Sequence, residues 1–137
     1  MKITLHHAHI FASNLDESIK FYQDMFGAKI LFDNKIAGAR NVMISIGLAK
    51  INFYDQPPKD QGRGAIHHLG IETDDLDALV THMKNKGFQF IKKIKNLGPL
   101  KYVMAAAPDN VLLELFEVVK DKLPEDQYNL ISTLDSL

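Results

Sequence analysis

The sequence predicts an α+β protein in which a unit of one strand, one helix and three further strands occurs twice, followed by a short C-terminal helix. The first copy spans residues 1–55, and the same order of elements returns over residues 65–118. Matching residues recur between the two copies at a nearly constant offset of 61. Because each copy is too small to close a hydrophobic core alone, we expect the two to pair into one domain over residues 1–137.

The composition is that of an ordinary folded domain. The chain has 137 residues, of which 46% are hydrophobic and 24% charged, and its net charge is −1. A balance so close to neutral argues against a nucleic-acid-binding protein that relies on a strongly basic face. The absence of cysteine excludes a disulfide scaffold, a thiolate zinc site and a cysteine nucleophile. No apolar run has the length of a signal peptide or a membrane span, so we expect a cytoplasmic protein with no membrane partner.

The first copy begins with a strand over Ile3–Phe11, which is rich in strand-forming residues. Asn14 is a typical N-cap residue and starts the helix that Gly27 ends. The apolar face of this helix has helical spacing and consists of Leu15, Ile19, Tyr22 and Phe26. Three short strands are then predicted, at Lys29–Asp33, Asn41–Ile46 and Lys50–Asp55.

The second copy follows a turn-rich linker at residues 56–64. Its first strand is predicted at Ala65–Glu72, and either Asp74 or Asp75 can cap the next helix, which Gly87 ends. The apolar face of that helix consists of Leu76, Leu79, Val80 and Met83. Three strands complete the copy, at Phe88–Lys92, Lys101–Ala106 and Val111–Val118.

Five of the six histidines fall on the first strand of a copy: His6, His7, His9, His67 and His68. Alternate residues of a strand share a face, which places His7 with His9 and His68 with Gly70. The residues on the opposite faces are small or aliphatic and should pack under the helices. We therefore expect His7 and His68 to line the open face of the sheet.

Glu114 is a lone carboxylate in the apolar run of residues 111–116. A charge in such a run is costly unless it is paired or bound to a metal. Together with His7 and His68 it makes a set of two imidazoles and one carboxylate, which suits a divalent metal with open coordination positions. Residue spacing alone leaves an alternative, in which the histidines are structural and Glu114 pairs with Lys101 or Arg40.

Several short motifs occur in an order that is typical of one superfamily. They are His7 followed by Asn14-Leu15-Asp16-Glu17-Ser18, Phe21-Tyr22 and Phe26-Gly27; His68 followed by Asp75-Leu76; and Pro108-Asp109-Asn110 leading to Leu113-Glu114-Leu115. Over residues 3–118 the chain resembles the vicinal oxygen chelate superfamily. This superfamily includes glyoxalase I, methylmalonyl-CoA epimerase, extradiol dioxygenases, fosfomycin-resistance enzymes and bleomycin-resistance proteins. The resemblance implies paired βαβββ modules that form an open barrel-like cup around a metal.

The resemblance also implies the metal ligands. Members with four protein ligands take one from each first strand and one from each fourth strand, positions that are here His7, Asn52, His68 and Glu114. Asn52 departs from the usual Glu or Gln and is shorter and neutral, so we predict three ligands: His7, His68 and Glu114. Imidazole and carboxylate together suit one divalent transition metal ion, with Zn, Fe, Mn, Co and Ni all open.

Further residues are predicted to act on the substrate. Glu114 and His9 are the predicted catalytic residues, since both can exchange a proton near neutral pH when suitably placed. The predicted substrate contacts are Asn52, Tyr54, Tyr102 and Arg40. The alternatives are a His9 that bonds a neighbouring strand, tyrosines that serve packing, and an Arg40 that is a solvated charge.

The predicted function is that of a metal-dependent enzyme, with lyase- or isomerase-type proton transfer on a small substrate that has vicinal oxygens. The alternatives are a metal-free, ligand-sequestering binding protein of the bleomycin-resistance type and a ring-cleaving dioxygenase-like activity. The branch stays open because each pattern is incomplete. Residues 18–71 contain no glutamate to act as the epimerase base, and the loop at Asn96–Pro99 is too short for a fosfomycin-resistance enzyme.

Residues 119–137 lie outside the repeat and are predicted to form a short helix that starts near Pro124. Its apolar residues are Leu130, Ile131, Leu134 and Leu137. A helix this short is not stable alone and must pack on its own sheets or on a second subunit. Members of the superfamily are commonly dimers, and open strand edges favour association, so we expect a homodimer.

Overall fold

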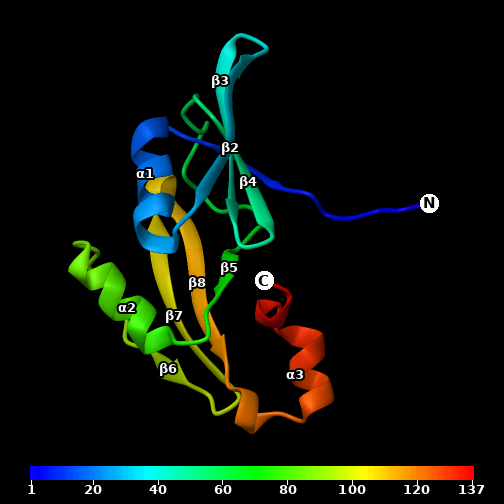
Figure 1. The fold of residues 1–137 in the computed structure, drawn as a ribbon. Coiled ribbons are helices and arrows are strands. Elements are labelled where there is room, and N and C mark those ends of the chain that lie inside the picture. Colours follow the sequence, from blue (N-terminus) through cyan, green and yellow to red (C-terminus); the bar gives the residue numbers. More distant parts are fainter. The chain divides into compact units, whose positions relative to one another are not determined.

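The computed structural model describes residues 1–137, and the chain divides into two compact units (Figure 1). The first unit comprises Met1–Gly62 together with Pro108–Asn110, and the second comprises Arg63–Ala107 together with Val111–Leu137. Each unit contains one four-stranded sheet.

The first unit has the predicted order of strand, helix and three strands. Its elements are β1 (Ala8–Phe11), α1 (Leu15–Phe26), β2 (Lys29–Ile36), β3 (Ala39–Ile46) and β4 (Ala49–Tyr54). The strand order in the sheet is β1-β4-β3-β2, with β1 parallel to β4 and the other neighbours antiparallel. The central strand β4 therefore receives β1 on one side and β3 on the other.

The second unit repeats this topology. Its elements are β5 (Leu69–Glu72), α2 (Leu76–Asn85), β6 (Lys95–Asn96), β7 (Leu100–Ala107), β8 (Val111–Val118) and the C-terminal α3 (Glu125–Ile131). The strand order is β5-β8-β7-β6, and β5 is parallel to β8. The predicted α+β fold of two βαβββ modules and a short terminal helix is confirmed.

Local signals set the limits of the two long helices. The Asn14 side chain accepts a hydrogen bond from the Glu17 amide at 3.1 Å, and the Asp75 side chain accepts one from the Ala78 amide at 2.9 Å. These bonds satisfy amides that have no partner within the helix. Asp75 is thus the cap, and Asp74 is not. Gly27 follows α1 with a φ of 66°, a left-handed conformation that glycine adopts without strain.

Both cores lie between the helix and one face of the sheet. In the first unit the buried residues include Ile19, Tyr22, Val42, Ile44, Ile51 and Phe53, and in the second they include Leu76, Met83, Val103, Leu113 and Leu115. The Tyr22 and Phe53 rings lie 5.4 Å apart, so α1 packs on the face that carries Phe53. Each fully buried side chain of this size contributes about 1.5–3 kcal/mol to stability.

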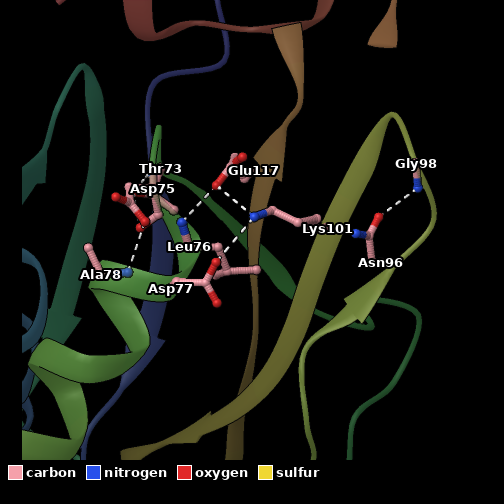
Figure 2. A network of polar contacts seen from close by, with 9 residues as sticks. All are labelled: Thr73, Asp75, Leu76, Asp77, Ala78, Asn96, Gly98, Lys101 and Glu117. Carbon is pink, nitrogen blue, oxygen red and sulfur yellow. Dashed lines mark hydrogen bonds and ion pairs between the residues drawn. The ribbon is translucent and has the colours of Figure 1, made fainter. Parts of the chain in front are cut away.

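Each unit also contains an ion pair that joins the first turn of its helix to its third strand. Arg40 Nη1 lies 2.8 Å from Asp16 Oδ1, and Lys101 Nζ lies 3.3 Å from Asp77 Oδ2. Figure 2 shows the second pair, in which Lys101 also lies 3.5 Å from Glu117 and Glu117 accepts a hydrogen bond from the Leu76 amide. Since both residues of each pair correspond at an offset of 61, the repeat extends from the sequence to the interactions.

Three predicted strands are absent or shorter in the structure, because a strand forms only where a neighbouring strand can hydrogen-bond with it. The strand predicted at Phe88–Lys92 does not form, and β6 is instead the two-residue Lys95–Asn96, paired with Tyr102 and Lys101. The Phe88 and Phe90 rings pack on each other, with centroids 4.8 Å apart. These residues favour strands by composition, but no neighbouring strand forms a hydrogen-bonded ladder with them.

The first strands of the two modules are shorter than predicted. The parallel ladder of β1 with β4 covers only Ala8 to Phe11, and that of β5 with β8 covers only Leu69 to Glu72. Residues before these ladders have no hydrogen-bonded neighbour strand, and Ile3 and Ile66 are exposed. His7 and His68 each stand one residue before the strand rather than inside it.

The C-terminal helix ends at Ile131, earlier than the apolar pattern through Leu137 indicates. Ser132 is extended, and a short 3-10 turn follows at Leu134–Ser136. Tyr128 is buried within the second unit, whereas Leu130 and Leu137 are exposed. The helix is therefore anchored through one aromatic side chain.

Removing either N-cap should destabilise the fold without changing its topology. We expect Asn14→Ala and Asp75→Ala each to lower the free energy of unfolding by about 1 kcal/mol, because one helix amide loses its partner. Urea denaturation measures the change. The matched control is Asp74→Ala, which removes the neighbouring carboxylate but no cap and should lie within about 0.5 kcal/mol of the parent. Equal effects for Asp74→Ala and Asp75→Ala would contradict the capping assignment.

Candidate functional site

The alternation of side chains along β4 and β8 places one polar residue of each strand away from the core. Ile51 and Phe53 are buried in the first core, and Leu113 and Leu115 in the second. Asn52 and Glu114 lie between them and point to the opposite face of their sheet. We call this face, in each unit, the site face.

On the site face of the second unit, His68 and Glu114 come together. Gly70 pairs with Glu114 in the parallel ladder, and His68 is two residues before Gly70 on the same side. His68 Nε2 lies 3.6 Å from Glu114 Oε2, and the two side chains are 33% and 24% exposed. Both side chains are therefore partly exposed to solvent.

Glu114 does not pair with either of the cations considered as alternatives. Lys101 contacts Asp77 and Glu117. Arg40 donates two hydrogen bonds to Asp33, at 2.9 and 2.8 Å, and one to Asp16 at 2.8 Å. The hydrogen bonds from Arg40 lower the pKa of the Asp33 carboxyl. The guanidinium of Arg40 is thus already hydrogen-bonded to two carboxylates, and its contact with a substrate stays a prediction.

On the site face of the first unit, His9 and Asn52 are linked to a third residue. Asn52 Nδ2 lies 3.2 Å from His9 Nδ1 and donates to Asn41 Oδ1 at 3.2 Å. The side chains of Asn41 and Asn52 are buried, whereas His9 is exposed. The His9 ring also packs against Phe11 and Tyr54, with centroids 5.6 and 5.4 Å away.

The remaining predicted site residues occupy three different settings. His7 is exposed ahead of β1, with its Nδ1 3.0 Å from His6 Nδ1. Tyr54 shares the site face of the first unit with Asn52. Tyr102 pairs with Phe116 in the ladder next to the Met104–Glu114 pair, which puts it on the site face of the second unit.

The donor atoms fit a metal ion in part. No group of three His, Asp or Glu side chains lies close enough together to hold one. Two ligands that bind one ion at about 2.0–2.2 Å lie roughly 3–3.5 Å apart. The His68–Glu114 separation of 3.6 Å is close to this spacing. An imidazole and a carboxylate are also the donor types that divalent transition metals accept.

Two further features were not anticipated from the sequence. Asn41 is the first residue of the predicted strand Asn41–Ile46 and follows Arg40, so it is not the lone polar residue of an apolar run that Glu114 is. Glu72 Oε1 accepts hydrogen bonds from the Thr133 amide at 2.9 Å and from the Thr133 hydroxyl at 3.0 Å. Glu72 pairs with Phe116 in the ladder and shares the face of Glu114. The C-terminal segment is therefore tied to the site face of the second unit.

None of the helices has the length and apolar character that crossing a bilayer requires.

Two βαβββ modules, each with its helix on one face and polar residues on the other, define a protein with the glyoxalase-type fold. Residues 4–115 match the family model of the Glyoxalase/Bleomycin resistance protein/Dioxygenase superfamily, and the chain belongs to this superfamily. The resemblance seen in the motifs is thereby confirmed.

Two similar proteins are enzymes by name. The chain is 28% identical to the mitochondrial methylmalonyl-CoA epimerase of Dictyostelium discoideum, over 82% of this chain and 77% of that protein. It is 26% identical to the lactoylglutathione lyase of Schizosaccharomyces pombe, over 81% of this chain but only 46% of that protein.

A solved structure has the same fold. It is that of a mutant of the fosfomycin resistance protein FosX from Listeria monocytogenes, complexed with manganese(II) and 1S,2S-dihydroxypropylphosphonic acid. The TM-score is 0.74 at 18% identity, over 89% of this chain and 97% of that one. At this identity the likeness concerns the fold alone.

Proposed function

We propose that the protein is a metal-dependent enzyme that catalyses a lyase- or isomerase-type proton transfer on a small substrate with vicinal oxygens. The observation that carries the proposal is the His68–Glu114 pair, in which an imidazole just before β5 meets a carboxylate on β8. Similar proteins named as an epimerase and a lyase, and a manganese-bound structure of the same fold, support it.

In this proposal His7 and His68 hold a divalent transition ion through imidazole nitrogens, and Glu114 holds it through one carboxylate oxygen. When bound, such an ion supplies a Lewis acid that polarises a carbonyl or enolate oxygen. A carboxylate has two oxygens, so the second oxygen of Glu114 can accept a proton from the substrate carbon and return it to a neighbouring atom. Tyr54 and Tyr102 border the substrate on their respective site faces.

Asn52 is not a metal ligand in this proposal, because its side chain is one methylene shorter than the usual Glu or Gln and carries no charge. We expect Asn52→Ala to leave the affinity for a divalent ion nearly unchanged. His68→Ala should lower it by about a hundredfold or more, because even residues that only support a ligand contribute tenfold to a hundredfold. Titration calorimetry with Co²⁺ measures both.

The control for this comparison is His82→Ala, which removes a histidine from α2 and should bind Co²⁺ like the parent. Circular dichroism checks that each variant is folded. An equal loss of affinity for Asn52→Ala and His68→Ala would show that the three-ligand assignment is wrong.

Proton transfer can be tested without knowing the overall reaction. In D₂O, the metal-loaded protein should replace the exchangeable carbon-bound proton of methylmalonyl-CoA or lactoylglutathione, seen as loss of its ¹H NMR signal. Glu114→Gln should slow this exchange by about a hundredfold or more, because an amide cannot accept the proton.

The matched control is Glu117→Gln, the same substitution on the opposite face of β8, which should exchange at the parent rate. A metal-loaded protein that binds either compound but exchanges no proton would contradict the enzyme proposal and favour a ligand-sequestering protein.

A further inference from the structure

The chain of amides on the first unit's site face determines which way each amide points. Asn41 Nδ2 lies 3.4 Å from the Ile36 carbonyl and 3.3 Å from the Ala39 carbonyl. Carbonyl oxygens only accept hydrogen bonds, so the Asn41 nitrogen faces them and its Oδ1 faces Asn52. Turning Asn41 over would place its oxygen against two carbonyl oxygens.

The orientation of Asn52 follows from that of Asn41. Because Asn41 Oδ1 is an acceptor, the atom of Asn52 that faces it at 3.2 Å must be the Nδ2 donor. The second proton of Nδ2 then points to His9 Nδ1, also at 3.2 Å. Asn52 Oδ1 is left buried with no hydrogen-bond partner. An acceptor without a partner costs less than two oxygens that face each other. The hydrogen bonds of Nδ2, and not the surroundings of Oδ1, therefore determine the orientation of the Asn52 amide.

The tautomer of His9 follows in turn. A ring nitrogen that accepts a hydrogen bond carries no proton, so Nδ1 is the bare nitrogen and the proton sits on Nε2. His9 is an exposed residue on the site face. Its Nε2–H group is therefore a hydrogen-bond donor.

We propose that Asn41 and Asn52 are positioning residues that hold His9 as an Nε2–H donor for an anionic oxygen of the substrate. This role rests on the proposed function only in that the site face receives a substrate. It makes His9 a binding residue for a carboxylate or enolate oxygen at the site face of the first unit.

The tautomer can be observed directly by long-range ¹H–¹⁵N NMR of the histidine rings at about pH 8, above the ordinary pKa of histidine. His9→Gln identifies the signal that belongs to His9. The parent protein should show the proton on Nε2. Because a free imidazole also favours this form, the decisive variant is Asn52→Asp, whose carboxylate only accepts and should move the His9 proton to Nδ1.

The control variant is Asn34→Ala, which removes an amide of the same sheet that pairs with Asn41 in the ladder but lies outside the chain of side-chain bonds. It should leave the His9 signals unchanged. A parent protein with the proton on Nδ1, or an Asn52→Asp variant with the parent pattern, would overturn the positioning role. Neither result depends on metal or substrate, so failure here is distinct from failure of the proposed function.

The donor role is tested with oxalate, which offers two vicinal anionic oxygens, titrated into the protein with and without Co²⁺. His9→Leu should weaken oxalate binding by about tenfold or more, as expected for one lost hydrogen bond to a charged group. His9→Gln, whose amide can still donate, should recover most of the affinity. Unchanged binding by His9→Leu would overturn the assignment of His9 as the donor to an anionic oxygen.

Discussion

The strict alternation of side chains on the two central strands is the constraint on which the rest of the structure depends. In β4 and β8 the apolar neighbours must face the core under the helix, and this forces Asn52 and Glu114 to the other side. A slip of one residue would bury a carboxylate and expose two leucines, so the register is strongly specified. The chemistry of the protein therefore stands on its two best-packed strands, and we expect its geometry to be rigid.

Duplication gives the two units one scaffold and two different site faces. The helix-to-strand ion pairs of Arg40 and Lys101 are equivalent in the two units. The corresponding site positions have diverged, because His9 is matched by Gly70. A Cβ at Gly70 would lie 3.2 Å from the Phe116 ring, so this position leaves room for an aromatic side chain instead of supplying a polar group. The site face of the first unit carries the hydrogen-bonded set of His9, Asn52 and Asn41, and that of the second carries the His68–Glu114 pair.

Sequence reasoning succeeded where the signal is local and failed where it depends on distant partners. The caps at Asn14 and Asp75 and the stop at Gly27 are each determined within one helical turn, and all of them form. The run at Phe88–Lys92 has the composition of a strand, but only a neighbouring edge could have made it one. Glu114 and His68 were grouped from the sequence as candidate metal ligands, and their side chains lie 3.6 Å apart in the second unit.

The positions that sequence reasoning missed have partners on other elements of the fold. Asn41 meets Asn52 across a hairpin, and Glu72 meets Thr133 across 61 residues. Neither contact has a sequence spacing that indicates it, because tertiary structure alone brings the partners together. Asn41 follows Arg40 at the start of its predicted strand and so lacks the clue that identified Glu114, which is a lone polar residue in an apolar run.

The central claim is that two histidines and one carboxylate of each chain hold a single divalent ion. Native mass spectrometry of protein purified without a histidine tag, before and after loading with Mn²⁺ or Co²⁺, tests it most directly. The account predicts one ion for each chain in the parent protein and none in a variant that combines His68→Ala with Glu114→Ala. A parent protein that takes up no ion after loading, or a double variant that still retains one, would contradict it.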